Sequence, residues 1–186
     1  LQEGWREYEF RWLTNPFLRR YPGFDRPAWN GQSLQDRTIL LWVEQGFGDT
    51  IQFIRYAPLV KALGATVLVM ARDGLEGLLR ECAGIDRIVR RDEPVPPFDF
   101  HCPLMSLPRV FGTDLGSMPA VTPYLRPSAA MARKWKDRLP ATTRRRVGIV
   151  WAGSPAHPND RYRSISLELL APVLATEGVH FVSLQK

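Results

Sequence analysis

The stretch Thr38-Ile39-Leu40-Leu41-Trp42-Val43, followed by Glu44-Gln45-Gly46-Phe47-Gly48-Asp49, decides the fold. Its first half is a continuous, largely apolar run, which predicts a parallel strand that is covered on both faces. Its second half holds two glycines and leads into an amphipathic run that is typical of a helix. A glycine turn between a strand and a helix start is a natural ligand site in α/β proteins.

The residues after this turn complete a βαβ unit over 38–70. Asp49 and Gln52 form a capping pattern that predicts the start of a helix. Pro58 is expected to kink the helix, and Gly64 is expected to end it. The run 66–70 then reads as the next strand, so we expect a right-handed crossover between two parallel strands.

A second strand, turn and helix of the same design follow about a hundred residues later. Residues 147–151 predict a strand, Ala152-Gly153-Ser154 a turn, and the run from Ser166 a helix, before a closing strand at 179–184. Two similar halves indicate two lobes with a cleft. The fold class that we predict is α/β with parallel sheets.

The remaining segments give the expected domain organisation. Residues 2–13 predict an amphipathic packing helix that ends at Asn15-Pro16, and 16–35 predict an ordered connector. Further expected elements are a helix at 74–82, strands at 87–89 and 98–101, an irregular proline-rich connection at 103–127 with a short helix at 105–110, and a helix after Ser128. The predicted domains are therefore 1–35, 36–143 and 144–186.

The charge, the cysteine content and the apolar runs of the chain disfavour several classes of protein. The net charge is +6 and the pI is 9.7, but the basic residues are mostly arginines spread along the whole chain, without a recognition motif for nucleic acid. The two cysteines form no C-x-x-C pair, which favours a reducing, cytoplasmic setting without a zinc site. No apolar run reaches the ~20 residues of a membrane helix.

The sequence looks truncated at both ends. We therefore expect a fragment whose incomplete second lobe could self-associate.

Several common catalytic motifs are absent from the sequence. Gly46-x-Gly48 lacks the third glycine of a dinucleotide fingerprint, because Ile51 stands in its place. A nicotinamide-dependent oxidoreductase is therefore disfavoured. The phosphate loop of nucleotide hydrolases, the zinc peptidase motif and the serine hydrolase elbow are also missing.

Asp49 is the sharpest catalytic candidate in the first half. A carboxylate at a helix start should stay ionised and could take a proton from an acceptor hydroxyl. From spacing alone, the simpler interpretation is that Asp49 only caps the helix. Glu44, Gln45, Gly46 and Gly48 are the neighbours that we expect to line the acceptor-side loop.

The polar loop of the second half is the other candidate site. Small residues allow a ligand to approach the backbone, and arginines offer planar donors to phosphate oxygens. A solvated surface loop is the alternative. The residues that we expect to contact a donor diphosphate are Gly153, Ser154, Asn159, Arg161, Arg163 and Ser164.

These motifs together resemble those of a known group of proteins. The run Glu44 to Phe53, the segment His101 to Pro108, and Val150 to Ser154 with Asn159 to Ser164 are similar to bacterial tetratricopeptide-repeat proteins that carry a heptosyltransferase-like glycosyltransferase domain. The resemblance covers essentially the whole chain.

The resemblance implies a GT-B architecture, in which two Rossmann-like lobes hold an acceptor and a nucleotide sugar and no metal cofactor is obligatory. Gly48-Asp49 matches the position of the family's catalytic base, and Arg163 the position of a diphosphate ligand. A later family motif, D-T-x-x-x-H-L, is missing. Sugar transfer to a protein or glycan acceptor is thus the leading hypothesis, and a non-catalytic scaffold module is the alternative.

Overall fold

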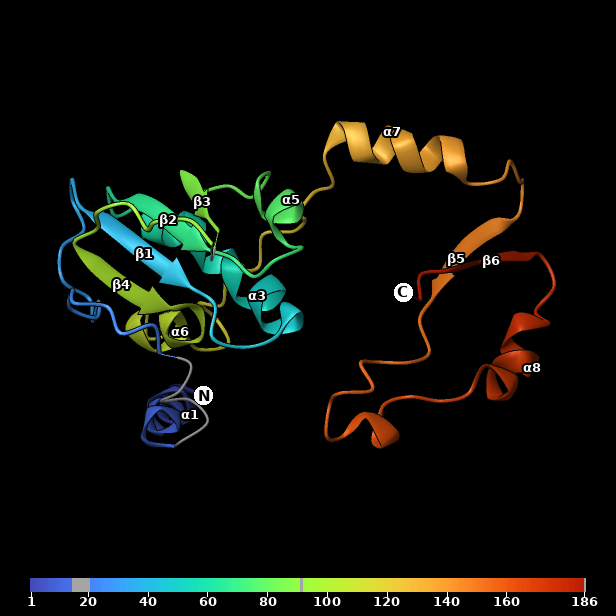
Figure 1. The fold of residues 1–186 in the computed structure, drawn as a ribbon, viewed down its shortest axis with the longest axis horizontal. Helices are drawn as coiled ribbons and strands as arrows, with labels where there is room; N and C mark the ends of the chain where they lie inside the picture. Colours follow the sequence, from blue (N-terminus) through green and yellow to red (C-terminus); the bar gives the residue numbers. More distant parts are fainter. Residues whose placement is uncertain (15–20, 91, 186) are drawn as a thin grey trace. The chain divides into compact units, whose positions relative to one another are not determined.

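The computed structural model describes residues 1–14, 21–90 and 92–185. The chain forms two compact units, Leu1–Ala132 and Arg133–Lys186, which are described here one at a time (Figure 1). The expected end of the N-terminal helix at Asn15-Pro16 lies outside the described residues.

The first unit is built on a four-stranded sheet. Its strands are β1 (Thr38–Trp42), β2 (Thr66–Met70), β3 (Arg87–Val89) and β4 (Phe100–Pro103). All neighbouring strands are parallel, in the order β3-β2-β1-β4, so that Leu40 pairs with Leu68 on one side and with His101 on the other. This is a Rossmann-like α/β arrangement and confirms the predicted βαβ unit. The strand predicted at 98–101 begins two residues later, because Asp99 instead accepts a hydrogen bond from the backbone of Thr38.

The central strand β1 is buried on both faces, as the apolar run predicts. Ile39 and Leu41 face the larger apolar cluster, which contains residues of the helices after β1. Leu40 faces a smaller cluster with Leu68, against which Phe24 packs. The two faces are therefore covered unequally, with helices on one face and mainly connecting segments on the other.

The helical segment after β1 is broken, as the position of Pro58 predicts. It consists of α3 (Phe47–Phe53), a 3-10 turn (Ile54–Tyr56) and α4 (Ala57–Lys61). Proline has no N–H to continue an α-helical ladder, and here it occupies the first turn of α4, where none is needed. Gly64 ends the segment with a φ of 85°. Close packing against α4 also requires a glycine at position 84, where a Cβ would lie 2.5 Å from the backbone nitrogen of Pro58.

The other helices of the first unit are short. They are α1 (Gln2–Tyr8) with its 3-10 extension Glu9–Leu13, α5 (Glu76–Leu79), and the 3-10 turn Leu104–Ser106 with α6 (Leu107–Val110). The helix predicted at 74–82 is therefore confirmed only in its centre. Its expected start is a turn, in which Gly74 has a φ of 91°.

Helix α7 (Ala129–Arg138) begins after Ser128, whose hydroxyl accepts a hydrogen bond from the backbone of Met131.

The second unit contains a parallel strand pair, β5 (Arg145–Ile149) and β6 (Val179–Ser183). Between them lie two 3-10 turns, Asp160–Tyr162 and Leu167–Leu170, and α8 (Ala171–Leu174). The strand predicted at 147–151 starts two residues earlier and ends before Trp151, whose backbone N–H instead donates to the side chain of Gln185. None of the described helices in either unit has the length and apolar character needed to cross a bilayer.

Candidate functional site

The order of the strands defines a switch point in the first sheet, between β1 and β4. From β1 the chain moves outward to β2 and β3, and then returns to place β4 on the opposite side of β1. In open parallel sheets, ligands bind outside the carboxyl ends of the two strands where the order reverses. Here Glu44 follows the end of β1, and Ser106 follows the end of β4.

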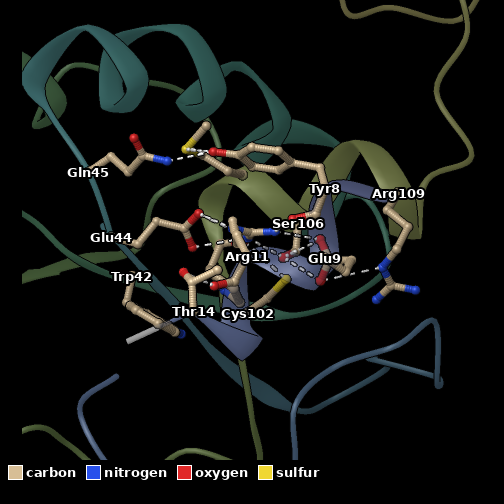
Figure 2. Close-up of polar contacts among 12 residues, drawn as sticks. Tyr8, Glu9, Arg11, Thr14, Trp42, Glu44, Gln45, Cys102, Ser106 and Arg109 are labelled. Carbon is tan, nitrogen blue, oxygen red and sulfur yellow. Dashed lines mark hydrogen bonds and ion pairs between the residues drawn. The ribbon is translucent and has the colours of Figure 1, made fainter. Parts of the chain in front are cut away.

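The side chain of Arg11 lies between these two residues. Its Nε donates to Oε1 of Glu44 at 2.9 Å, and its Nη2 donates to Oε2 of Glu44 at 3.2 Å and to Oγ of Ser106 at 2.8 Å (Figure 2). The side chains of Arg11 and Glu44 are 4% and 1% exposed. A forked arginine–carboxylate pair thus joins the N-terminal segment to the carboxyl ends of β1 and β4.

The Arg11–Glu44 pair belongs to a larger network that starts in the N-terminal segment. Glu9 accepts hydrogen bonds from Nη1 of Arg11 and from Oγ of Ser106, both at 2.9 Å, and faces Nε of Arg109 at 3.7 Å. The guanidinium of Arg11 also lies over the ring of Tyr8, 4.5 Å from its centroid. Residues 1–13 therefore pack as part of the first unit, which confirms the predicted packing helix.

Sequence reasoning missed Arg11 and Ser106 as members of this site. Arg11 stands in an amphipathic run in which exposed arginines are the norm. Its aromatic neighbours give no signal of burial, since Phe10 next to it is 60% exposed. The partner of Arg11 is the predicted residue Glu44, so the carboxylate of Glu44 is already engaged.

The buried position of Glu44 gives the protein a pH-dependent stability. Burial raises the pKa of Glu44 to about 7, although the Arg11 guanidinium opposes this rise. The unfolded chain releases this proton near pH 4.5, so ionisation favours unfolding between these values. We expect the contribution of Glu44 to the free energy of unfolding to fall by at most about 3 kcal/mol as the pH rises from 4.5 to 7, and to level off above.

Urea denaturation between pH 4.5 and 8, followed by tryptophan fluorescence, measures this dependence. Glu44→Gln should remove the part of the fall that Glu44 causes, whereas Glu3→Gln, at an exposed position of α1, should leave the curve unchanged. Carboxyls with lowered pKa values, such as Asp86 and Asp99, act below this window. The lowered pKa of His101 acts within the window, where it makes stability rise with pH, and it is common to the wild type and both variants. Identical curves for the wild-type chain and Glu44→Gln would contradict the assignment.

Asp49 lies at the beginning of α3 but not at its N-cap. The N-cap is Gly46, and the carboxylate of Asp49 reaches back to accept a hydrogen bond from the Gly46 N–H at 2.9 Å. The expected pairing of Asp49 with Gln52 is therefore wrong, because the helix begins earlier, at Phe47, and Gln52 lies near its end. The physical result is a half-buried carboxylate whose orientation is fixed by the backbone just beyond β1.

The other predicted acceptor-side residues differ in their surroundings. Nε2 of Gln45 donates to the hydroxyl of Tyr8 at 2.5 Å, and the backbone carbonyl of Gln45 accepts from Nη1 of Arg72 at 2.9 Å. At Gly46 a Cβ would meet the carboxylate of Asp49 at 3.3 Å, so a small residue suits this position. Gly48 is exposed on α3 and has open space around it. Nothing in the structure explains a requirement for glycine there.

The polar loop of the second unit is held together by its own hydrogen bonds. The Gly153 N–H donates to Oγ of Ser164 at 2.8 Å, and this hydroxyl donates to Oδ1 of Asp160 at 2.8 Å. A Cβ at position 153 would lie 2.6 Å from Nη2 of Arg163 and 2.7 Å from Oδ1 of Asp160. The loop thus brings Gly153, Ser164 and Arg163 together, with Asp160 as an additional member that sequence reasoning did not single out.

The remaining predicted donor residues are not part of this group. Arg161 donates from Nη2 to the hydroxyl of its neighbour Tyr162 at 2.5 Å and covers that ring. Ser154 and Asn159 are exposed, and the Asn159 N–H donates to Nδ1 of His157 at 3.1 Å. Asp49 lies in the first unit and Arg163 in the second.

Comparison with known proteins gives a distant similarity. Protein FlbA of Caulobacter vibrioides is 26% identical to this chain over 204 aligned positions. The alignment covers 98% of this chain and 34% of FlbA, so the chain spans about a third of that relative's length. No family model matches the chain. No solved structure matches it either.

Proposed function

We propose that the protein transfers a sugar from a nucleotide-sugar donor to an acceptor hydroxyl, within a GT-B architecture of two Rossmann-like lobes. One observation carries the proposal. The carboxylate of Asp49 is held by the Gly46 N–H directly beyond β1, at the carboxyl edge of a parallel sheet. This is the edge at which α/β proteins place their catalytic groups.

In the proposed reaction, Asp49 takes the proton of the acceptor hydroxyl. The acceptor oxygen forms a bond to the anomeric carbon of the donor sugar, and the bond from that carbon to the diphosphate oxygen breaks. The nucleoside diphosphate leaves with the bonding electron pair. Asp49 suits the role of base because its orientation is fixed before a substrate arrives.

The second unit is proposed to bind the diphosphate of the donor. Arg163 is exposed, and its guanidinium lies directly over Gly153, where a Cβ would leave no room for it. A guanidinium can donate two parallel hydrogen bonds to phosphate oxygens, which is the usual way arginine recognises this group. The resemblance to tetratricopeptide-repeat glycosyltransferases supports the same residue.

Donor binding is tested by titrating nucleoside diphosphates into the intact protein, including any sequence that flanks these residues. We expect one of UDP, GDP, ADP and CDP to bind, and Arg163→Gln to weaken its affinity at least ~10-fold, since a charge-assisted hydrogen bond is worth ~1.5–3 kcal/mol. Arg146→Gln, which alters an exposed β5 residue bonded to the Pro140 carbonyl, is the matched control. Equal affinity in the two variants would remove Arg163 from the donor site.

A non-catalytic scaffold module is the second candidate function. It is favoured by the Arg11–Glu44 pair, because Arg11 already engages the carboxylate that follows β1 and so withdraws it from a ligand. A scaffold predicts that isothermal calorimetry detects no nucleotide or nucleotide sugar bound to the intact protein. Micromolar binding of any of the four diphosphates rejects it.

A further inference from the structure

The first unit contains a cavity of about 370 Å³ at the switch point of its sheet. Trp42 is the last residue of β1 and His101–Pro103 are the end of β4, and both segments line it. None of the predicted acceptor-side residues, from Glu44 to Asp49, belongs to its lining among the described residues. The cavity therefore differs from the site that sequence reasoning predicted.

One wall of the cavity is aromatic and has a fixed orientation. Trp42 donates its indole N–H to Nδ1 of His101 at 3.2 Å, and the Tyr21 hydroxyl lies 3.3 Å from Nε2 of the same ring. Trp12 stacks at a tilt on Trp42, with centroids 5.4 Å apart. Burial lowers the pKa of His101, so the ring is neutral near pH 7. Trp42 and His101 are buried behind the wall, so the ring surfaces open to the cavity are those of Trp12 and Tyr21, and neither carries a charge.

The polar part of the lining carries an excess of positive charge. Arg26 is exposed at the cavity, and Arg109 lines it together with Glu9. The carboxylate of Glu9 is already bonded to Arg11 and Ser106. Nη1 of Arg109 donates to Asn30 at 2.7 Å, but its Nε is buried without a hydrogen-bond acceptor among the described residues, since Glu9 lies 3.7 Å away. The Arg109 side chain as a whole is 27% exposed, so an anionic ligand would approach the guanidinium from its accessible side and not at Nε.

We infer that this cavity binds an acidic monosaccharide, a single sugar ring that carries a carboxylate or a phosphate. Aromatic faces pack against the apolar C–H face of a sugar ring, and the two arginines pair with the acidic group. The volume is near the lower end of the ~300–1,000 Å³ of ligand pockets, which suits one ring rather than a nucleotide sugar. The inference depends only on the first unit and does not require sugar transfer.

Isothermal calorimetry of the intact protein with four probes tests the inference. Glucuronate and glucose 6-phosphate are the acidic sugars, glucose is the neutral sugar, and inorganic phosphate is the acidic group without a ring. We expect at least one acidic sugar to bind with a Kd of ~1 mM or tighter, and at least tenfold more tightly than glucose and phosphate. The acidic sugar that binds more tightly identifies the preferred acidic group.

Three variants locate the binding site. Arg109→Gln and Arg26→Gln should each weaken binding of the acidic sugar at least tenfold, and Arg26 is exposed, so its replacement leaves the fold intact. Arg87→Gln changes an exposed β3 residue that pairs with Glu93 and should bind like the wild type. The inference is overturned if neither acidic sugar binds, if glucose or phosphate binds equally well, or if Arg26→Gln and Arg109→Gln bind like Arg87→Gln.

Discussion

Asp49→Asn is expected to lower kcat for sugar transfer by ~10²–10⁴, the range that general-base catalysis contributes. The amide cannot take a proton from the acceptor hydroxyl, but its carbonyl oxygen can still accept the hydrogen bond from the Gly46 N–H. The start of α3 should therefore be preserved. The measurement is the release of nucleoside diphosphate by the intact protein, with a nucleotide sugar built on the diphosphate that binds in the titration.

Two comparisons separate a lost base from a damaged fold. Asp73→Asn removes an exposed carboxylate of the same unit and should leave kcat unchanged. Donor affinity should be the same in Asp49→Asn and the wild type, because the diphosphate is proposed to bind the second unit. Transfer at the wild-type rate in Asp49→Asn would exclude Asp49 as the base.

Arg11→Met is expected to destabilise the first unit by ~3–5 kcal/mol at pH 8, the usual cost of breaking a buried ion pair from one side. The substitution leaves the carboxylate of Glu44 buried without its forked partner, and leaves Ser106 without its donor. At pH 5 the loss should be smaller, since Glu44 can then take up a proton instead of remaining charged. Urea denaturation at both pH values, followed by tryptophan fluorescence, measures the difference.

A double variant tests the cause of this loss. Arg11→Met combined with Glu44→Gln removes both charges and should recover a large part of the stability lost at pH 8. Arg6→Met, on the exposed side of α1, should change the free energy of unfolding by no more than ~0.5 kcal/mol. A double variant no more stable than Arg11→Met would show that the charge of Glu44 is not the cause.

The strands of the first unit were predictable because each is marked by its own composition. β1, β2 and β3 begin and end at or within one residue of the expected positions. Largely apolar runs bounded by polar residues leave little choice of where a buried strand begins and ends. Both errors at strand starts, in β4 and β5, occur where polar residues precede the apolar run. Asp99 and Arg145 show that backbone pairing can begin differently from the hydrophobic pattern.

The candidate sites were only partly predictable, for a different physical reason. Asp49 was found because its role depends on neighbours in sequence, although the helix start was misplaced by the preference for an aspartate N-cap. Arg11 and Ser106 meet across 95 positions, and Arg109 meets Glu9 across a similar separation. A single sequence carries no signal for such long-range pairing of polar side chains.

The two hydrogen bonds from Arg11 to Glu44 limit where this chain can be truncated. A truncation just before Thr38, where β1 begins, keeps every strand of the first sheet but removes Arg11, which neutralises the carboxylate of Glu44. Such a truncated protein would leave Glu44 without its partner and would expose the apolar surface of Phe53 that Trp5 covers. Recombinant versions of the first unit should therefore retain the initial thirteen amino acids.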